Sequence, residues 1–223
     1  KAKQNAKLKI ANKQKDEIIS AISHEFKNPI AIISGYTETI LNDEQMPQPM
    51  KIRFLKKIYS NANKMSQIVD KLRLTLKLEE GKQELILIPC SMKKLIITCI
   101  SDLKDKYKNR EILIQGDDIT LKVDETLISM AISNLIENAL KYSEDEIIVN
   151  ISDNSITIID KGIGIEEKEL EKINQKFYRI SNNGWNNSLG LGLFIVQSVL
   201  SLHNFTLKID SVFKNGSQFS INY

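Results

Sequence analysis

A histidine and a glutamate stand side by side at His24 and Glu25, within the stretch SHEFKNPI. An imidazole has an ordinary pKa of about 6.5, so at neutral pH its uncharged form presents a nitrogen lone pair. A neighbouring carboxylate can orient the other ring nitrogen and take its proton during attack on an electrophile. The two residues are therefore a candidate nucleophile and general base, although a lone outward histidine is more often an ordinary surface residue.

The residues around this pair predict a long amphipathic helix. Apolar positions alternate at spacings of four and three, which is typical of a heptad seam. They are Ile22, Phe26, Pro29, Ile33, Tyr36 and Ile40. His24 lies about 200° round such a helix from Ile22 and is expected to point outward. Pro29 cannot donate to the carbonyl of Glu25, so we expect a bent and loosened turn next to His24.

A second helix should follow the first after a turn. NDEQMPQP, residues 42–49, supplies turn formers and two prolines. A second alternating seam is predicted at Leu55, Ile58, Ala62, Met65, Val69, Leu72 and Leu76, and Gly81 is a candidate helix terminator. A hairpin of two such helices has one partner helix to cover its apolar stripe. We therefore expect a homodimer in which two hairpins form a four-helix bundle.

After Gly81 the sequence changes to short apolar runs that alternate with helical stretches. Strands are expected at 85–88, 111–115, 146–151, 155–160, 205–210 and 217–223, and helices at about 92–109, 124–142, 166–175 and 191–203. This order favours an α+β chain whose second part is an α/β sandwich. We expect a basic linker helix over 1–15, the hairpin over 16–81 and the sandwich over 85–223, with the boundary near 81–89.

A second polar cluster lies in NLIENALKYS. Asn134, Asn138, Lys141 and Tyr142 share one face of the expected helix because they are three or four residues apart. The opposite face is apolar and should pack on the sheet. Polar groups on a half-buried helix need partners, so the cluster indicates a ligand site. Taken alone, it is equally compatible with a solvent-facing polar stripe.

Two glycine motifs accompany this helix. DKGIGI ends a strand with Asp160 and places Gly162 and Gly164 where a flat ligand could approach the backbone. LGLGL, with Gly190 and Gly192, opens a helix whose free amides could bind phosphate. Neither motif completes GxGxxG and the P-loop pattern is absent, so a Rossmann or P-loop site is disfavoured.

Charge and cysteine content narrow the classes of function. The net charge is +3, but six lysines fall within the first fifteen residues and leave about −3 for the rest. A nucleic-acid partner is therefore not expected, because it needs a basic face on the folded body. Cys90 and Cys99 suggest neither a zinc site nor a disulfide. The sequence has no span of its own and starts at Lys1, so we expect a missing upstream segment that anchors the protein to the inner membrane and leaves this part in the cytoplasm.

In order and spacing, these motifs resemble those of the sensor histidine kinases of two-component signalling. SHEFKNPI resembles the phosphoacceptor box, NLIENALKYS the asparagine box, and DKGIGI and LGLGL the two glycine boxes. QKFYRIS, residues 175–181, is similar to the phenylalanine box between them, and NGSQFSI, residues 215–221, to the closing strand. The resemblance implies ATP and Mg²⁺ as cofactors and the receiver domain of a response regulator as partner.

The resemblance also implies a role for individual residues. His24 would accept the phosphoryl group, Glu25 would be its general base and Asn28 would orient water for dephosphorylation of the regulator. Asn138 would coordinate Mg²⁺ with help from Asn134, and Asp160 would accept a hydrogen bond from the adenine amino group. The remaining nucleotide contacts would come from Lys141, Tyr142, Gly162, Gly164, Arg179, Gly190 and Gly192.

A flexible lid is expected at about 176–189. The family often has glycine where Ser188 stands, so the local phosphate contacts there depart from its pattern, and Trp185 has no assigned role. The resemblance implies a kinase that phosphorylates His24 and passes the phosphoryl group to an aspartate. The alternatives are an ATP-operated clamp or chaperone-type ATPase, which needs no phosphoacceptor box, and a non-catalytic dimeric scaffold.

Overall fold

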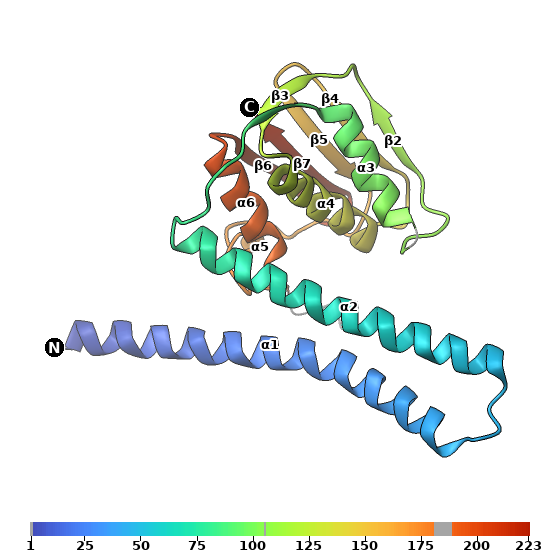
Figure 1. The fold of residues 1–223 in the computed structure, drawn as a ribbon. Coiled ribbons are helices and arrows are strands. Elements are labelled where there is room, and N and C mark those ends of the chain that lie inside the picture. Colours follow the sequence, from blue (N-terminus) through green and yellow to red (C-terminus); the bar gives the residue numbers. More distant parts are fainter. Residues whose placement is uncertain (1, 105, 181–188) are drawn as a thin grey trace. The chain divides into compact units, whose positions relative to one another are not determined.

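The computed structural model describes residues 2–104, 106–180 and 189–223, and their side chains from residue 19 onward. They form two compact units, which are described separately (Figure 1). The first unit contains the two long helices, and the second contains the sheet and its helices.

The first unit is a helical hairpin. Helix α1 (Ala2–Asn42) continues through Pro29, and α2 (Gln48–Glu79) begins one residue before Pro49. The two helices are joined by residues 43–47, as the turn formers there predict. Past the end of α2, Gly81 adopts a φ of 62°, and the N–H of Lys82 donates to the carbonyl of Lys77 at 3.1 Å. This is the glycine-terminated helix end that the sequence predicted.

The seam predicted for α1 is confirmed. Pro29 is buried, and the other five positions are half-buried, whereas most of their neighbours are exposed. The ring of Tyr36 lies 4.8 Å from the ring of Phe54 on α2, measured between centroids.

The seam predicted for α2 is only half right. Ile58, Met65 and Leu72 do lie on the covered side, but so do positions that were not predicted, among them Phe54, Asn61, Ile68 and Thr75. The predicted positions Leu55, Val69 and Leu76 are 50%, 51% and 58% exposed. The apolar stripe of α2 is wider than one helix can cover, so periodicity alone could not tell which edge faces α1.

The second unit is built on a mixed five-stranded sheet with the order β2-β4-β5-β7-β6. Its strands are β2 (Ile112–Gln115), β4 (Ile147–Ile151), β5 (Ser155–Asp160), β6 (Thr206–Val212) and β7 (Gly216–Asn222). β2 pairs in parallel with β4, and all other neighbours are antiparallel. A separate antiparallel pair is formed by β1 (Ile88–Ser91) and β3 (Thr120–Val123).

Three helices cover one face of the sheet (Figure 1). They are α3 (Met92–Lys104), α4 (Glu125–Tyr142) and α6 (Gly192–Leu202), while α5 (Glu167–Leu170) is a short turn of helix. α4 lies between α3 and α6, and its fully buried residues include Ile132, Leu135 and Ile136. This two-layer arrangement confirms the predicted α+β class.

Several predicted bounds need correction. Residues 85–87 are not in a strand: β1 starts at Ile88, and its partner β3 was not predicted. α3 ends at Lys104 instead of continuing to 109, and α5 is much shorter than 166–175. The four-residue strands β1 and β3 are too short for an alternating pattern to identify.

The start of α4 is fixed by Asp124. Its carboxylate accepts from the N–H of Leu127 at 3.0 Å, as an N-cap does, and from the N–H of Ile86 at 3.1 Å. The backbone N–H of Asp124 donates to Nε2 of the buried His203 at 3.0 Å. The helix that carries the predicted polar cluster is therefore tied to the end of α6 and to the segment that enters the second unit.

Candidate functional site

Asn134 lies where α4 meets the start of α6. It is 8% exposed, and its Nδ2 donates to the carbonyl of Met130 at 2.8 Å. A Cβ atom placed on Gly192, the first residue of α6, would lie 3.3 Å from Oδ1 of Asn134. The glycine therefore lets the start of α6 come close to the carboxamide oxygen.

The start of α6 offers backbone amides. Its N-cap residue, Leu191, makes no side-chain capping hydrogen bond, so the first N–H groups of α6 have no such partner. The preceding Gly190 has a φ of 67°, and its carbonyl accepts from the N–H of Phe177 at 3.0 Å. The predicted phenylalanine box thus contacts the second glycine box. The second glycine box leads directly into the N-terminus of α6, which is suited to phosphate.

Asp160 and Gly162 lie at the C-terminal end of α4. Asp160 is 5% exposed, and its Oδ1 accepts from the N–H of Gly162 at 2.8 Å. A Cβ atom on Gly162 would lie 2.0 Å from the carbonyl oxygen of Tyr142, which accepts from the N–H of Ile163 at 3.1 Å. Only glycine fits at this contact, which brings the acid to the last turn of α4.

Gly164 packs the first glycine box against the hairpin of β6 and β7. Its φ is 62°, and an added Cβ would lie 2.1 Å from the carbonyl oxygen of Val212. The N–H of Ile165 donates to Oγ of Ser211 at 2.8 Å, and the N–H of Lys214 donates to the carbonyl of Ile163 at 2.7 Å. These contacts fix the backbone that follows Asp160.

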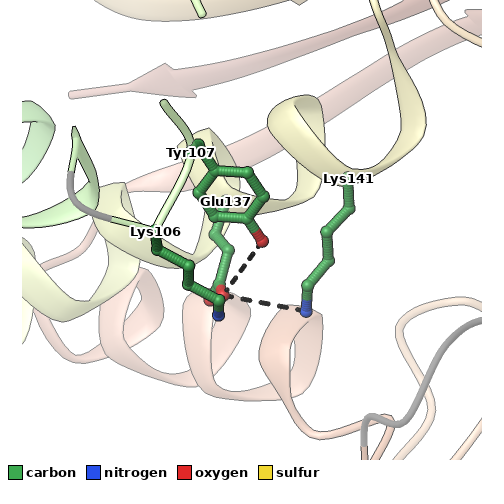
Figure 2. A network of polar contacts seen from close by, with 4 residues as sticks. All are labelled: Lys106, Tyr107, Glu137 and Lys141. Atoms are coloured by element: carbon green, nitrogen blue, oxygen red, sulfur yellow. Dashed lines mark hydrogen bonds and ion pairs between the residues drawn. The ribbon is translucent and has the colours of Figure 1, made fainter. Parts of the chain in front are cut away.

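Tyr142 and Lys141 complete the last turn of α4. Tyr142 is half-buried; burial raises the pKa of its phenol, and the positive charge of Arg179 lowers it. Arg179, which is exposed, therefore lies near enough to Tyr142 to act on it electrostatically. Nζ of Lys141 is 3.8 Å from Oε1 of Glu137, one helical turn earlier (Figure 2).

The structure thus connects the motifs of the second unit through α4. Asn134 contacts the second glycine box, and Tyr142 contacts the first. Half-buried Asn138 and exposed Lys141 lie on the helix between these contacts. The sequence analysis missed Glu137, although its spacing of four from Lys141 within NLIENALKYS is an ion-pair signal.

The carboxamides of this helix suit Mg²⁺ chemically. Mg²⁺ prefers oxygen ligands and usually takes only a few from the protein, with phosphate and water supplying the others. Asn138 and Asn134 offer such oxygens. Among the residues that the structure describes, no cluster of three or more His, Cys, Asp or Glu side chains could hold a metal ion.

The phosphoacceptor candidates lie on α1 in the first unit. His24 is exposed, as predicted from its position relative to Ile22. Glu25 is 4% exposed, and its Oε1 has no hydrogen-bond partner among the described residues. Asn28 is half-buried one turn after His24. The predicted lid falls mostly on 181–188, including Trp185 and Ser188, which lie outside the described residues.

The state of Asp160 leads to a prediction about pH. Burial raises the pKa of its carboxyl group, and the N–H groups of Gly162 and Ser217 lower it less. A raised pKa means that the carboxylate is protonated earlier as the pH falls. Protonation would remove an acceptor for the adenine amino group, the contact that the sequence analysis predicts for Asp160. ATP affinity should therefore fall on acidification at a higher pH than an exposed aspartate would cause.

The measurement is a titration of ATP into wild type and Asp160→Asn from neutral pH downward. The variant is uncharged throughout, so it should bind more weakly at neutral pH and lack this part of the pH dependence. Parallel pH profiles for the two proteins would show that the Asp160 carboxylate does not contact the nucleotide.

Comparison with known proteins identifies the class of this chain. Residues 14–81 match the family described as "His Kinase A (phospho-acceptor) domain". Residues 123–223 match the one described as "Histidine kinase-, DNA gyrase B-, and HSP90-like ATPase". The chain thus combines a phosphoacceptor domain with an ATP-binding domain of this ATPase class. It belongs to the sensor histidine kinases of two-component signalling.

Two curated relatives align with most of this chain. The phosphate regulon sensor protein PhoR of Pseudomonas aeruginosa is 31% identical over 218 residues, which cover 93% of this chain and 49% of that protein. Sporulation kinase B of Bacillus subtilis is 24% identical over 216 residues, which cover 92% and 48%. The chain therefore spans about half the length of these relatives.

Solved structures support the fold. Histidine kinase AdeS of Acinetobacter baumannii has a TM-score of 0.67 at 20% identity, covering 89% of this chain and 95% of that one. Full-length ShkA, solved in complex with AMPPNP, also has a TM-score of 0.67, at 18% identity and 92% coverage of this chain.

Among the described residues, no helix combines the length and apolar character needed to cross a bilayer.

Proposed function

We propose that this chain is the kinase portion of a two-component sensor, which transfers the γ-phosphoryl group of Mg·ATP to His24. The observation that carries the proposal is the meeting of both glycine boxes with α4, in a chain that also exposes His24 on a separate helical unit. A nucleotide site supplies the phosphoryl donor, and an exposed imidazole supplies the acceptor.

The transfer itself needs few groups. The lone pair of one His24 ring nitrogen attacks the γ-phosphorus, so that an N–P bond forms while the bond to the bridging oxygen of ADP breaks. Glu25 would accept the proton of the other ring nitrogen, in keeping with an Oε1 that has no hydrogen-bond partner in the part of the chain that the structure describes. Positioning and charge neutralisation provide most of the rate in such transfers.

The nucleotide would lie along α4. Asp160 would accept from the adenine amino group, Tyr142 would lie against the base, and Gly162 and Gly164 would leave room for it. At the other end, the amides that follow Gly190 and Gly192, with Lys141 and Arg179, would contact the phosphates. Asn138, assisted by Asn134, would hold Mg²⁺, which neutralises charge on the phosphate oxygens.

A homodimer would cover the apolar side chains that α2 leaves exposed. Ile52, Leu55, Tyr59, Ala62, Val69 and Leu76 follow one another at heptad-compatible spacings. The five larger side chains are 50–70% exposed in the single chain. Packing against a second hairpin would bury this stripe in a four-helix bundle. The homodimer therefore fits the extra width of the apolar face of α2.

The phosphoryl group would then pass from His24 to an aspartate on the receiver domain of a response regulator. Lysine-rich residues 1–15 would lie nearest to any upstream membrane anchor, where basic side chains interact with anionic lipid. We include an inner-membrane anchor outside this sequence, with this portion in the cytoplasm, as part of the proposal.

Asn28 would serve a separate reaction, the hydrolytic dephosphorylation of the regulator. It stands one turn from His24 on α1, and its carboxamide could orient a water molecule toward the acyl phosphate. Asn28→Ala should keep autophosphorylation and phosphotransfer but slow regulator dephosphorylation several-fold. The assay follows loss of phosphate from a phosphorylated cognate regulator after addition of the kinase and nucleotide.

Two outcomes would count against this role of Asn28. Equal dephosphorylation rates with wild type and Asn28→Ala would exclude the water-orienting role. Loss of autophosphorylation as well would mean that Asn28 supports the helix turn around His24.

An ATP-operated clamp or chaperone-type ATPase would use the second unit without phosphohistidine. Incubation with γ-labelled and, separately, α-labelled Mg·ATP distinguishes the two functions. A kinase incorporates label from γ-labelled ATP but not from α-labelled ATP, whereas a clamp releases the γ label as inorganic phosphate. Absence of protein-bound γ label, in a chain that binds Mg·ATP, would reject the proposed kinase activity.

A further inference from the structure

Glu137 is the centre of a polar network beside the proposed phosphate contact Lys141. Its carboxylate forms an ion pair with Nζ of Lys106 and lies 3.8 Å from Nζ of Lys141 (Figure 2). The hydroxyl of Tyr107 donates to the same carboxylate oxygen at 3.4 Å. The Glu137 side chain is only 17% exposed, so these interactions are screened by water less than surface ion pairs are.

The loop that contains Lys106 and Tyr107 also forms hydrogen bonds at the end of α4. Nη1 of Arg110 donates to the carbonyl of Leu140 at 3.1 Å, and Nη2 donates to the carbonyl of Asp145 at 2.8 Å. Carbonyls in the last turn of a helix lack partners within the helix, so a guanidinium there stabilises its end. Residues 106–110 therefore hold the part of α4 that carries Asn138, Lys141 and Tyr142.

The carboxylate of Glu137 interacts with two lysine side chains of the network. One carboxylate faces two ammonium groups, and Lys106 is the nearer of the two. Burial and the neighbouring carboxylate raise the pKa of the Tyr107 phenol, so that this side chain stays an uncharged donor. Lys106 and Tyr107 therefore hold the carboxylate of Glu137 beside Lys141, whose ammonium group is a proposed phosphate contact.

We propose that Glu137 is a positioning residue: it restrains Lys141 on the nucleotide face of α4, and Lys106 and Tyr107 hold Glu137 in place for this task. The inference rests on the proposed function, because Lys141 acts there on a phosphate of Mg·ATP. A positioning role and a purely electrostatic role of Glu137 predict opposite changes in ATP affinity when its charge is removed. Removal of the negative charge would strengthen ATP binding electrostatically, whereas loss of the restraint weakens it.

The test is calorimetric titration of the chain with a non-hydrolysable ATP analogue and Mg²⁺. Glu137→Gln should weaken binding about threefold, the range expected for a partly buried charged contact. Lys106→Met should weaken it by a similar factor. Lys108→Met is the matched control, because it removes the same charge from an exposed position in the same loop and should change affinity much less.

A double-mutant cycle separates positioning from a general structural role. In a Lys141→Met background, Glu137→Gln should have no further effect on affinity, because the residue it restrains is gone. An undiminished effect in that background, or tighter binding by the single variant Glu137→Gln, would overturn the inference. Failure of wild type to bind the analogue would instead reject the proposed function.

Discussion

Replacement of His24 by glutamine should abolish phosphorylation of the chain while its affinity for Mg·ATP stays unchanged. Glutamine has no ring nitrogen that can attack phosphorus, and His24 belongs to a different compact unit from the proposed nucleotide site. The loss should be complete within detection, because no other group in the proposed step provides the nucleophile. The measurement is incorporation of γ label into wild type and variant under identical conditions.

His203 provides the matched control for this experiment. It is the second histidine of the chain, is buried, and hydrogen-bonds through both ring nitrogens to backbone groups of Asp124 and Val199. His203→Gln leaves the acceptor site on α1 unchanged, so folded protein of this variant should still take up label. Undiminished labelling of His24→Gln would mean that another residue accepts the phosphoryl group.

Replacement of Asn138 by alanine should weaken Mg·ATP binding at least about tenfold, in line with the loss of a metal-site group. Alanine has a higher helix propensity than asparagine, and position 138 is only half-buried, so α4 should remain folded. Calorimetry with Mg²⁺ present and with Mg²⁺ chelated measures the effect. The difference between wild type and variant should shrink without the metal.

Asn154→Ala is the control, since Asn154 is exposed in the turn before β5 and lies outside the site. It should bind Mg·ATP as wild type does. If Asn138→Ala and Asn154→Ala bound Mg·ATP equally well, the polar face of α4 would not be a metal or nucleotide site. The alternative interpretation of its sequence, a solvent-facing polar stripe, would then hold.

The fold was largely predictable because most elements have strong local patterns. The longer strands, such as β6, alternate clearly, and α4 has an N-cap aspartate before its apolar positions. The face of α2 was harder, since an apolar stripe wider than one helix can cover gives the same alternation in two registers. The short pair β1 and β3 is held by residues distant in sequence, which local patterns do not reveal.

The candidate site was predictable where glycine is required by geometry. Gly162 and Gly164 face carbonyl oxygens that would clash with any Cβ atom, so the sequence has to retain glycine there. The partners of Glu137 and Leu140 were not predictable, because Lys106 and Arg110 reach them across about thirty residues of chain. Such contacts depend on how α3 and α4 pack, and no spacing rule contains that information.

The chemical stability of the labelled protein is the most direct test of the central claim. A phosphoryl group on a histidine nitrogen is hydrolysed readily in acid and survives in alkali, whereas phosphoserine and phosphothreonine show the opposite behaviour. After incubation with γ-labelled Mg·ATP, we expect label on wild type that is lost in acid, retained in alkali and located at His24 by peptide mapping. An acid-stable label, or one located outside the peptide that contains His24, would contradict the account.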